Sequence, residues 1–217
     1  NGPVGIAIGN NRAVYITDSC NDRIRVLVGS ARTGRPEVAT IAGSSPGFAD
    51  GPTANAKFNT PTGIAISSEG LLVGDSGNRR LRLIEKHLEY PWGPVSTLAG
   101  TVEADLHDGP LSEATFVQPT ALAVHKDGTV FVADGNAIRE ISGDISKTVK
   151  TISSDPRGLA DGELANSRFN RPSGLALDRN GDLLVADSEN RLYRRLSASN
   201  KGAAITAEQI AAMKDTA

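Results

Sequence analysis

The sequence has little of what stabilises many small proteins: one cysteine, Cys20, and only 4% aromatic residues among 217. A single cysteine cannot form an internal disulfide, so nothing favours a disulfide-stapled fold, and secretion stays open. No apolar run approaches the roughly 18 residues of a membrane-spanning helix, and no signal-peptide pattern opens the chain. Because the sequence starts at Asn1 rather than at methionine, we expect a trimmed or partial chain.

The sequence also lacks a large excess of charge of one sign. The net charge is −2, from 23 basic and 25 acidic residues mixed along the chain. Nucleic-acid binding normally requires a clear basic excess on a domain or patch, and the composition supplies none globally.

Glycine and proline are abundant instead, with 23 and 11 copies, and they accompany an internal repeat. The stretch GFADGPTANAKFNTPTGIAI, from Gly47, returns as GLADGELANSRFNRPSGLAL from Gly158. A looser version, DLHDGPLSEATFVQPTALAV, starts at Asp105. Periods of this length indicate a solenoid, a propeller or another repeat array, so the period decides the fold class.

Three landmarks set the register of the repeat. A phenylalanine lies eight residues after the aspartate of an Asp-Gly pair and three before a proline; these are Phe58, Phe116 and Phe169. A second aspartate follows each proline by 14 or 15 residues, and a fourth proline and aspartate open the chain. The prolines are Pro3, Pro61, Pro119 and Pro172, spaced by 58, 58 and 53 residues, and the aspartates are Asp18, Asp75, Asp134 and Asp187.

Inside each repeat, hydrophobic residues alternate with a period of two, which predicts strands rather than helices. Segments such as TGIAIS, LLVGDS and RLRLIE indicate three strands, and VSTLAG indicates a fourth. A four-stranded sheet of about 55 residues can bury its apolar faces only against neighbouring sheets, so the repeats predict the blades of a β-propeller. We expect an all-β fold of antiparallel blades, with the first strand of each blade innermost and buried on both faces.

The repeat resembles the NHL repeat. The resemblance is carried by PVGIAIGNNRAVYITDSCNDRI, PTGIAISSEGLLVGDSGNRRL and PSGLALDRNGDLLVADSENRL, whereas PTALAVHKDGTVFVADGNAI departs by losing a residue after Asp134. It implies a six-bladed propeller that usually acts as a binding or scaffolding module. We expect blades at about 1–59, 60–117, 118–170 and 171–206.

The tail and the number of blades give two further expectations. Thr206 and Gln209 form a capping-box pattern, which favours a helix from about Ala207 to Lys214 within a helical or coil tail at 207–217. Four blades are fewer than the six that the resemblance implies. We expect further blades or a partner chain to complete the ring, with a compact four-bladed ring as the alternative.

The repeated polar residues have a structural and a functional interpretation. The second-strand aspartates could bind a cation, but a residue needed once per blade is more simply a turn device that accepts N–H bonds in the loop to the third strand. We expect the following asparagine to adopt a left-handed conformation, the nearby arginine to bridge adjacent blades, and the phenylalanines to wedge between blades. The candidate partner-binding residues in these top-face loops are Asn21, Arg23, Asn78, Arg80, Asn190 and Arg191.

An enzymatic role is an alternative. Some propellers related to this family are lyases or lactone hydrolases with a metal on the axis. The three histidines lie at different registers, because we expect His87 and His125 on the bottom face and His107 in a linker that reaches the top. Cys20 has no histidine at its register, and no G-x-S-x-G motif occurs. We therefore predict no catalytic residue, metal or cofactor.

RNA binding is the other alternative, because some NHL propellers bind RNA on a basic surface. The clusters NRRLR at 78–82 and RLYRR at 191–195 lie along third strands rather than in one loop patch, and only Trp92 and three tyrosines could stack on bases. We expect a non-enzymatic interaction or scaffold module that binds a protein or carbohydrate partner through its blade loops. The expected setting is extracellular or periplasmic.

Overall fold

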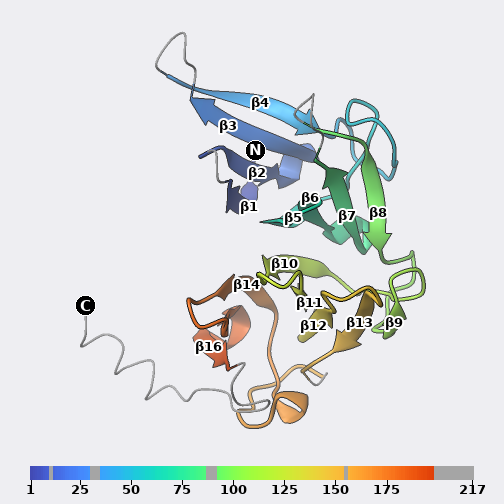
Figure 1. The fold of residues 1–217 in the computed structure, drawn as a ribbon. Coiled ribbons are helices and arrows are strands. Elements are labelled where there is room, and N and C mark those ends of the chain that lie inside the picture. The colour runs from blue at the N-terminus through green and yellow to red at the C-terminus, as the bar shows by residue number, and fades with distance from the viewer. Residues whose placement is uncertain (10–11, 30–34, 87–91, 154–155, 198–217) are drawn as a thin grey trace. The chain divides into compact units, whose positions relative to one another are not determined.

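The chain forms antiparallel sheets whose strands follow one another in sequence order, apart from one two-residue strand at the edge of the third sheet (Figure 1). The computed structural model describes residues 1–9, 12–29, 35–86, 92–153 and 156–197. The chain divides into two compact units, Asn1–His107 with Leu111–Pro119 and Asp108–Pro110 with Thr120–Ala217. The predicted class, an all-β propeller chain of antiparallel blades, is confirmed. Among the described residues, no helix is long and apolar enough to cross a membrane.

The first unit contains two four-stranded blades. Blade one comprises β1 (Pro3–Ile8), β2 (Val14–Asp18), β3 (Arg23–Gly29) and β4 (Pro36–Ala42). Blade two comprises β5 (Pro61–Ile66), β6 (Gly70–Asp75), β7 (Arg80–Glu85) and β8 (Val95–Ala99). One turn of 3-10 helix joins the second strand to the third in each blade, η1 (Ser19–Asn21) and η2 (Ser76–Asn78).

The sheets of the second unit differ in strand number. Blade three comprises β10 (Pro119–Val124), β11 (Val130–Asp134), β12 (Ala137–Ile141) and β13 (Thr148–Thr151), and β9 (Gly109–Pro110) extends it at the edge of β13. The described part of blade four comprises β14 (Pro172–Leu177), β15 (Leu183–Asp187) and β16 (Leu192–Leu196), with η3 (Leu164–Asn166) before it and η4 (Ser188–Asn190) within it. The helix predicted from about Ala207 to Lys214, within the tail at 207–217, lies outside the described residues.

In the linkers before blades two and three, the Asp-Gly pair attaches the linker to the fourth strand of the blade that follows it. Asp50 accepts hydrogen bonds from the Thr97 N–H at 3.2 Å and from the Thr97 hydroxyl at 2.9 Å, and Gly51 bridges to Val95 on β8. In blade three, Asp108 accepts the same two bonds from Thr151, and β9 pairs with β13. The linker therefore closes the outer edge of its own blade.

The three phenylalanines at the shared register are fully buried, as predicted. The linker can bring Phe58 close to blade one because Gly43, at φ 94°, has no side chain. A Cβ atom at Gly43 would lie 2.3 Å from the Asp22 carbonyl oxygen and 3.2 Å from the Phe58 ring. Gly100 stands in the same relation to Phe116. Glycine is needed here for both its φ angle and its small size.

Hydroxyl groups at the inner ends of the strands join consecutive blades. The Thr17 hydroxyl donates to the Thr62 carbonyl at 2.6 Å, and the Ser19 hydroxyl donates to the Pro61 carbonyl. The Thr62 hydroxyl donates in the same way to the carbonyl of Pro119, the last residue of the first unit, at 3.1 Å. The Ser76 and Thr120 hydroxyls donate to the Pro119 and Pro172 carbonyls. Pro61, Pro119 and Pro172, which start the second to fourth repeats, thus accept hydrogen bonds from hydroxyl groups of the repeat before them.

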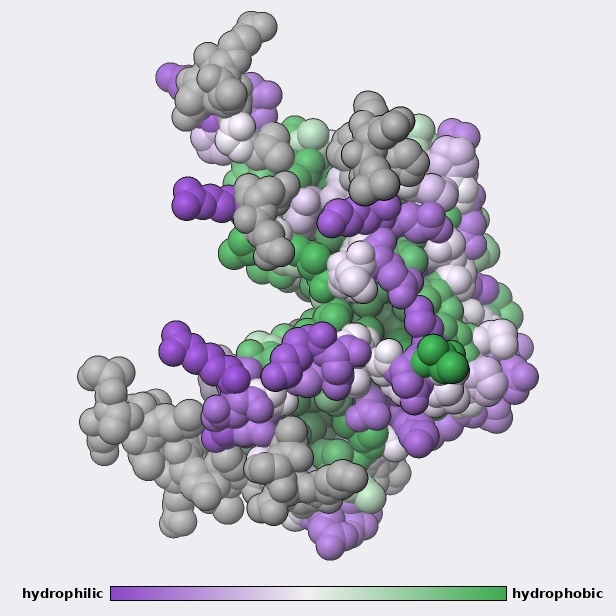
Figure 2. All heavy atoms as spheres, in the orientation of Figure 1, coloured by the Kyte–Doolittle hydropathy of each residue, from purple (hydrophilic) through white to green (hydrophobic). Residues whose placement is uncertain are grey.

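Burial of the first strand is not uniform. The strands β5 and β10 are almost fully buried, as expected for innermost strands. The expectation fails for β1, where Val4, Ile6 and Ile8 are exposed, and hydrophobic atoms gather over this strand (Figure 2). The strand β14 is also only partly buried. The physical reason is that a blade sequence supplies an apolar face, whereas burial requires a neighbouring blade on that face.

The hairpin between β10 and β11 gives a pH-dependent prediction. The Thr129 N–H and the His125 Nδ1–H donate to the Asp127 carboxylate at 2.9 and 2.8 Å, and these bonds lower its pKa from 3.8 to about 2. A lowered folded-state pKa stabilises the protein above the unfolded-state value, and the stabilisation is lost as the pH falls toward 2. We expect Asp127→Asn to lower the free energy of unfolding at pH 6 by less than about 1 kcal/mol, because the carboxylate is solvent-screened. Urea titrations at pH 6 and pH 2 check this, and an equal deficit at both values would contradict it.

Candidate interaction surface

The second-strand aspartate is the centre of a buried hydrogen-bond network. In blade two, one Asp75 oxygen accepts from the Asn59 N–H at 2.8 Å. The other oxygen accepts from Asn78 Nδ2 at 2.8 Å and from Arg82 Nη1 at 2.7 Å. Asn59 lies in the linker before β5, so the backbone N–H bonded to Asp75 comes from the entrance to the blade. We had expected that N–H to come from the loop to the third strand, which Asp75 instead holds through the Asn78 side chain. In blade four, Asp187 accepts the corresponding three bonds from Asn170, Asn190 and Arg194.

The partner of this aspartate is an arginine in the middle of the third strand. The Arg82 side chain is fully buried, and its second terminal nitrogen donates to Asp50 at 2.5 Å and to the Ala49 carbonyl at 2.8 Å. The guanidinium carbon lies 5.0 Å from the centre of the Phe58 ring. Arg82 therefore ties together the strand aspartate, the linker aspartate and the wedge.

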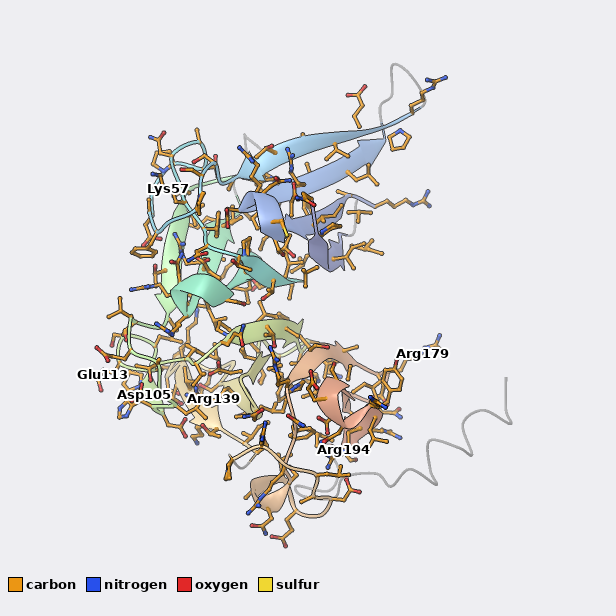
Figure 3. All side chains as sticks on the ribbon, turned by 180° about the vertical axis from the view of Figure 1, so that it is seen from behind. Lys57, Asp105, Glu113, Arg139, Arg179 and Arg194 are labelled. Atoms are coloured by element: carbon orange, nitrogen blue, oxygen red, sulfur yellow. The ribbon has the colours of Figure 1, made fainter. Side chains whose placement is uncertain are left out.

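The other blades repeat this pairing. Arg139 and Arg194, labelled in Figure 3, pair with Asp134 and Asp187 in their own blades. They also pair with the linker residues Asp108 and Asp161. In blade one, Arg25 pairs with Asp18 at 3.0 Å. Sequence reasoning missed these arginines, although their alternation with aliphatic residues in the third strand already placed them on one face of the blade.

Burial raises the pKa of the Asp75 carboxyl above its ordinary value, although the bonds from Asn78, Asn59 and Arg82 oppose the rise. A buried carboxylate is tolerated only when its partners remain in place. The blade therefore needs this network in order to fold. The carboxylates accept hydrogen bonds from donors within the protein.

The structure places the candidate asparagines inside the same network. Asn21, Asn78 and Asn190 donate to the aspartate three residues earlier, and the last two also donate to the Gly47 and Gly158 carbonyls. The prediction that these asparagines are left-handed is wrong. The left-handed residues are the next ones along the chain, Asp22, Arg79 and Arg191, with φ of 53°, 56° and 57°.

The candidate arginines fall into two classes. The guanidinium groups of Arg23 and Arg80 donate to the Asn21 and Asn78 carbonyls two residues earlier, so each caps its own loop. We had predicted instead that they bridge adjacent blades. Arg191 is exposed and lies one register position earlier, at the left-handed residue. The sequence alignment had treated it as equivalent to Arg80.

An exposed patch surrounds η2 in the first unit. Phe48 and Val102 are 46% and 67% exposed. The Arg80 guanidinium carbon lies 4.1 Å from the Phe48 ring centre, and Arg79 donates to the Val102 carbonyl at 3.1 Å. We call Phe48, Arg79, Arg80 and Val102 the η2 patch. Arg80 contacts Phe48 in the linker before blade two, and Arg79 contacts Val102 in the linker after it. Each linker thus exposes one apolar side chain beside an arginine.

The histidines do not gather in the described part of the chain. His125 pairs with Asp127 in a hairpin, His107 lies in a linker, and His87 falls outside the described residues. Among the residues that the structure describes, no group of three or more histidine, cysteine, aspartate or glutamate side chains could hold a metal ion.

Comparison with known proteins agrees with the repeat and the fold. The family model of the NHL repeat matches residues 1–27 and 169–191. NHL repeat-containing protein 2 of Gallus gallus is 33% identical over 87 residues, which cover 40% of this chain and 11% of that protein. The chain is an NHL-repeat β-propeller chain.

A second relative of this NHL chain is much longer than the chain itself. Protein SUPPRESSOR OF QUENCHING 1, chloroplastic, of Arabidopsis thaliana is 32% identical over 145 residues, which cover 62% of this chain. The matched part is 13% of that protein, so the NHL chain spans only a small part of either curated relative.

Three solved structures have the same fold at 16–19% sequence identity, and each match covers 89–94% of the NHL chain. A protein of unknown function from Bacteroides thetaiotaomicron has a TM-score of 0.72, and an auxiliary nutrient binding protein from the same organism has 0.67; the chain covers 47% of each. A catalytically inactive virginiamycin B lyase from Staphylococcus aureus with quinupristin has a TM-score of 0.58, and 55% of it is covered.

Proposed function

We propose that this NHL chain is a non-enzymatic interaction module that binds a partner through its blade-edge loops, with the η2 patch as the contact surface. The observation that carries the proposal is the pairing of exposed apolar side chains with arginines held in place. Phe48 and Val102 are exposed beside Arg80 and Arg79, whose guanidinium groups are fixed by contacts within the protein. Aromatic residues and arginine are enriched in protein interfaces and in their binding hot spots.

Fixation of the arginines favours binding for an energetic reason. A long side chain that is ordered only on binding loses rotamer entropy, which reduces affinity. Arg79 and Arg80 are already ordered by the Val102 and Asn78 carbonyls, so less of that cost remains. The surface is therefore pre-organised for a partner with apolar and anionic or carbonyl groups.

The patch favours a protein partner over RNA and is also compatible with a carbohydrate that stacks on Phe48. Of the basic clusters seen in the sequence, Arg82 and Arg194 are buried and paired with two aspartates each, so they are not available to phosphate groups. Solved relatives in fold include a nutrient binding protein and a lyase, so the proposal rests on the surface rather than on the fold.

Affinity capture with matched variants tests the proposal. The bait is the chain itself, the patch variant is Phe48→Ala with Arg79→Glu, and the control is Lys126→Glu, which changes an exposed hairpin residue outside the patch. We expect the patch variant to lose at least about tenfold of a partner that the wild-type chain and the control both retain. Equal retention by all three proteins would contradict the proposal. A glycan array probed with the same three proteins separates a carbohydrate from a protein partner.

A further inference from the structure

The η2 patch has its two kinds of side chain in a fixed order across blade two. The Phe48 ring, from the linker before the blade, lies against the Arg80 guanidinium at 4.1 Å. Arg79 precedes Arg80 in the chain and donates to the carbonyl of Val102, in the linker after the blade, at 3.1 Å. The order is therefore apolar, basic, basic and apolar, and contacts within the first unit set it.

The pair of arginines is not a feature of the repeat. In blade one, the strand pairing and the turn place Asp22 and Arg23 at the corresponding positions, so one of the two charges is reversed. In blade four the corresponding residues are Arg191 and Leu192, so one charge is missing. The described residues of blade three have no 3-10 helix between β11 and β12. Blades of this chain thus form without the pair, and the blade architecture does not explain it.

Both guanidinium groups keep hydrogen-bond donors for a ligand. A guanidinium has five N–H donors in a planar fork that fits a carboxylate. Arg79 donates through Nη1 to the Val102 carbonyl, and Arg80 donates through Nη1 to the Asn78 carbonyl. No described residue accepts a hydrogen bond from Nη2 of either arginine, and both side chains are half-buried rather than enclosed. One donor group therefore remains for each of two anionic groups.

Carboxylates limit the basic region on both sides. Asp50, two residues after Phe48, has a side chain that is 42% exposed and pairs with the buried Arg82. Glu103 follows Val102 directly and is exposed. Acidic groups of a ligand that extended beyond the two apolar side chains would meet like charge, which opposes binding. The surface thus confines the acidic groups of a ligand to the middle.

We propose that the η2 patch binds a short acidic segment of a partner protein, with two carboxylates between two apolar side chains. The carboxylates bind Arg79 and Arg80, and the apolar side chains cover Phe48 and Val102. A peptide supplies both kinds of group in one order along its chain, whereas a neutral sugar supplies no anion. The proposal rests on the proposed function, because it names the partner of the same surface.

Selection from a random peptide library displayed on phage tests the proposal, with the immobilised chain as bait. We expect the enriched peptides to carry two acidic residues flanked by apolar residues, with no preference for acidic residues farther out. Their synthetic forms should bind Arg79→Glu at least about tenfold more weakly than the wild-type chain. Lys126→Glu, the same charge reversal on an exposed hairpin of blade three, should bind them as the wild-type chain does.

Reversal of both charges separates direct contact from a loss of structure. The same selection on the double variant Arg79→Glu with Arg80→Glu should enrich basic residues at the two middle positions. If circular dichroism shows that this variant does not fold, Arg79→Gln takes its place, because glutamine removes the charge but keeps side-chain N–H donors. We then expect the acidic peptides to bind at least about fivefold more weakly than to the wild-type chain.

Two results would overturn the proposal. Enriched peptides that depend on the patch but lack acidic residues would assign it a different chemistry, and the proposed function would stand. Failure to enrich any peptide that depends on the patch would also overturn it. Affinity capture and the glycan array would then decide about the proposed function separately, because they also detect a folded protein surface or a carbohydrate.

Discussion

Replacing Arg82 with alanine is expected to lower the free energy of unfolding by about 3–5 kcal/mol, because the change leaves a buried carboxylate without its counter-charge. Arg82 donates to Asp75 and Asp50 and to two linker carbonyls, all from a fully buried position. Removing it takes the counter-charge from the buried Asp75 and detaches the linker. Chemical denaturation of the two proteins, followed by circular dichroism, measures the difference.

Arg80 provides the matched control, because it lies on the same strand and is only half-buried. Its guanidinium caps the Asn78 carbonyl and stacks on Phe48, so Arg80→Ala is expected to cost about 1 kcal/mol or less. Similar losses for Arg80→Ala and Arg82→Ala would contradict the assignment of the buried network to Arg82.

Phe58→Ala is expected to cost about 3–5 kcal/mol, because it leaves a cavity in the core between blades one and two. The ring is fully buried and belongs to one apolar cluster with Ile24 of blade one and Val73 of blade two. The substitution also removes the ring against which the Arg82 guanidinium packs. The same denaturation experiment measures the loss.

Phe48→Ala is the control for this prediction, since Phe48 is the same residue type in the same linker but is exposed. We expect it to change the free energy of unfolding by about 1 kcal/mol or less. If Phe48→Ala were as destabilising as Phe58→Ala, the wedge role of the buried phenylalanines would be wrong.

The blade architecture could be predicted from the sequence because it depends on local spacing. The alternation in TGIAIS and RLRLIE, and the fixed distance from each phenylalanine to the following proline, indicated antiparallel blades with wedges between them. These signals arise from side-chain direction along a strand, which a single repeat determines by itself.

The roles of the polar residues could not be predicted as well, because they depend on contacts between distant segments. Arg82 meets Asp50 across 32 positions, and nothing within one repeat shows that the linker supplies a second carboxylate. The placement of Arg191 failed for a local reason. Blade four has one residue fewer between the asparagine and the arginine, and the alignment by residue type concealed that shift.

Differences between equivalent positions were also invisible in the sequence. Tyr193 and Leu81 have the same place in the repeat, yet one is exposed and the other is buried. The exposed fraction of such a residue depends on the neighbouring blade, whereas the repeat pattern contains information only about the blade in which the residue lies.

The central claim is that the repeated aspartate and arginine build the blade and do not bind a partner directly. A double-mutant cycle with Asp75→Asn and Arg82→Met, read as free energies of unfolding, tests it most directly. We predict a coupling energy of at least about 2 kcal/mol, because each single change leaves the other group buried without its partner. Single-mutant effects that add to within about 0.5 kcal/mol would contradict the claim.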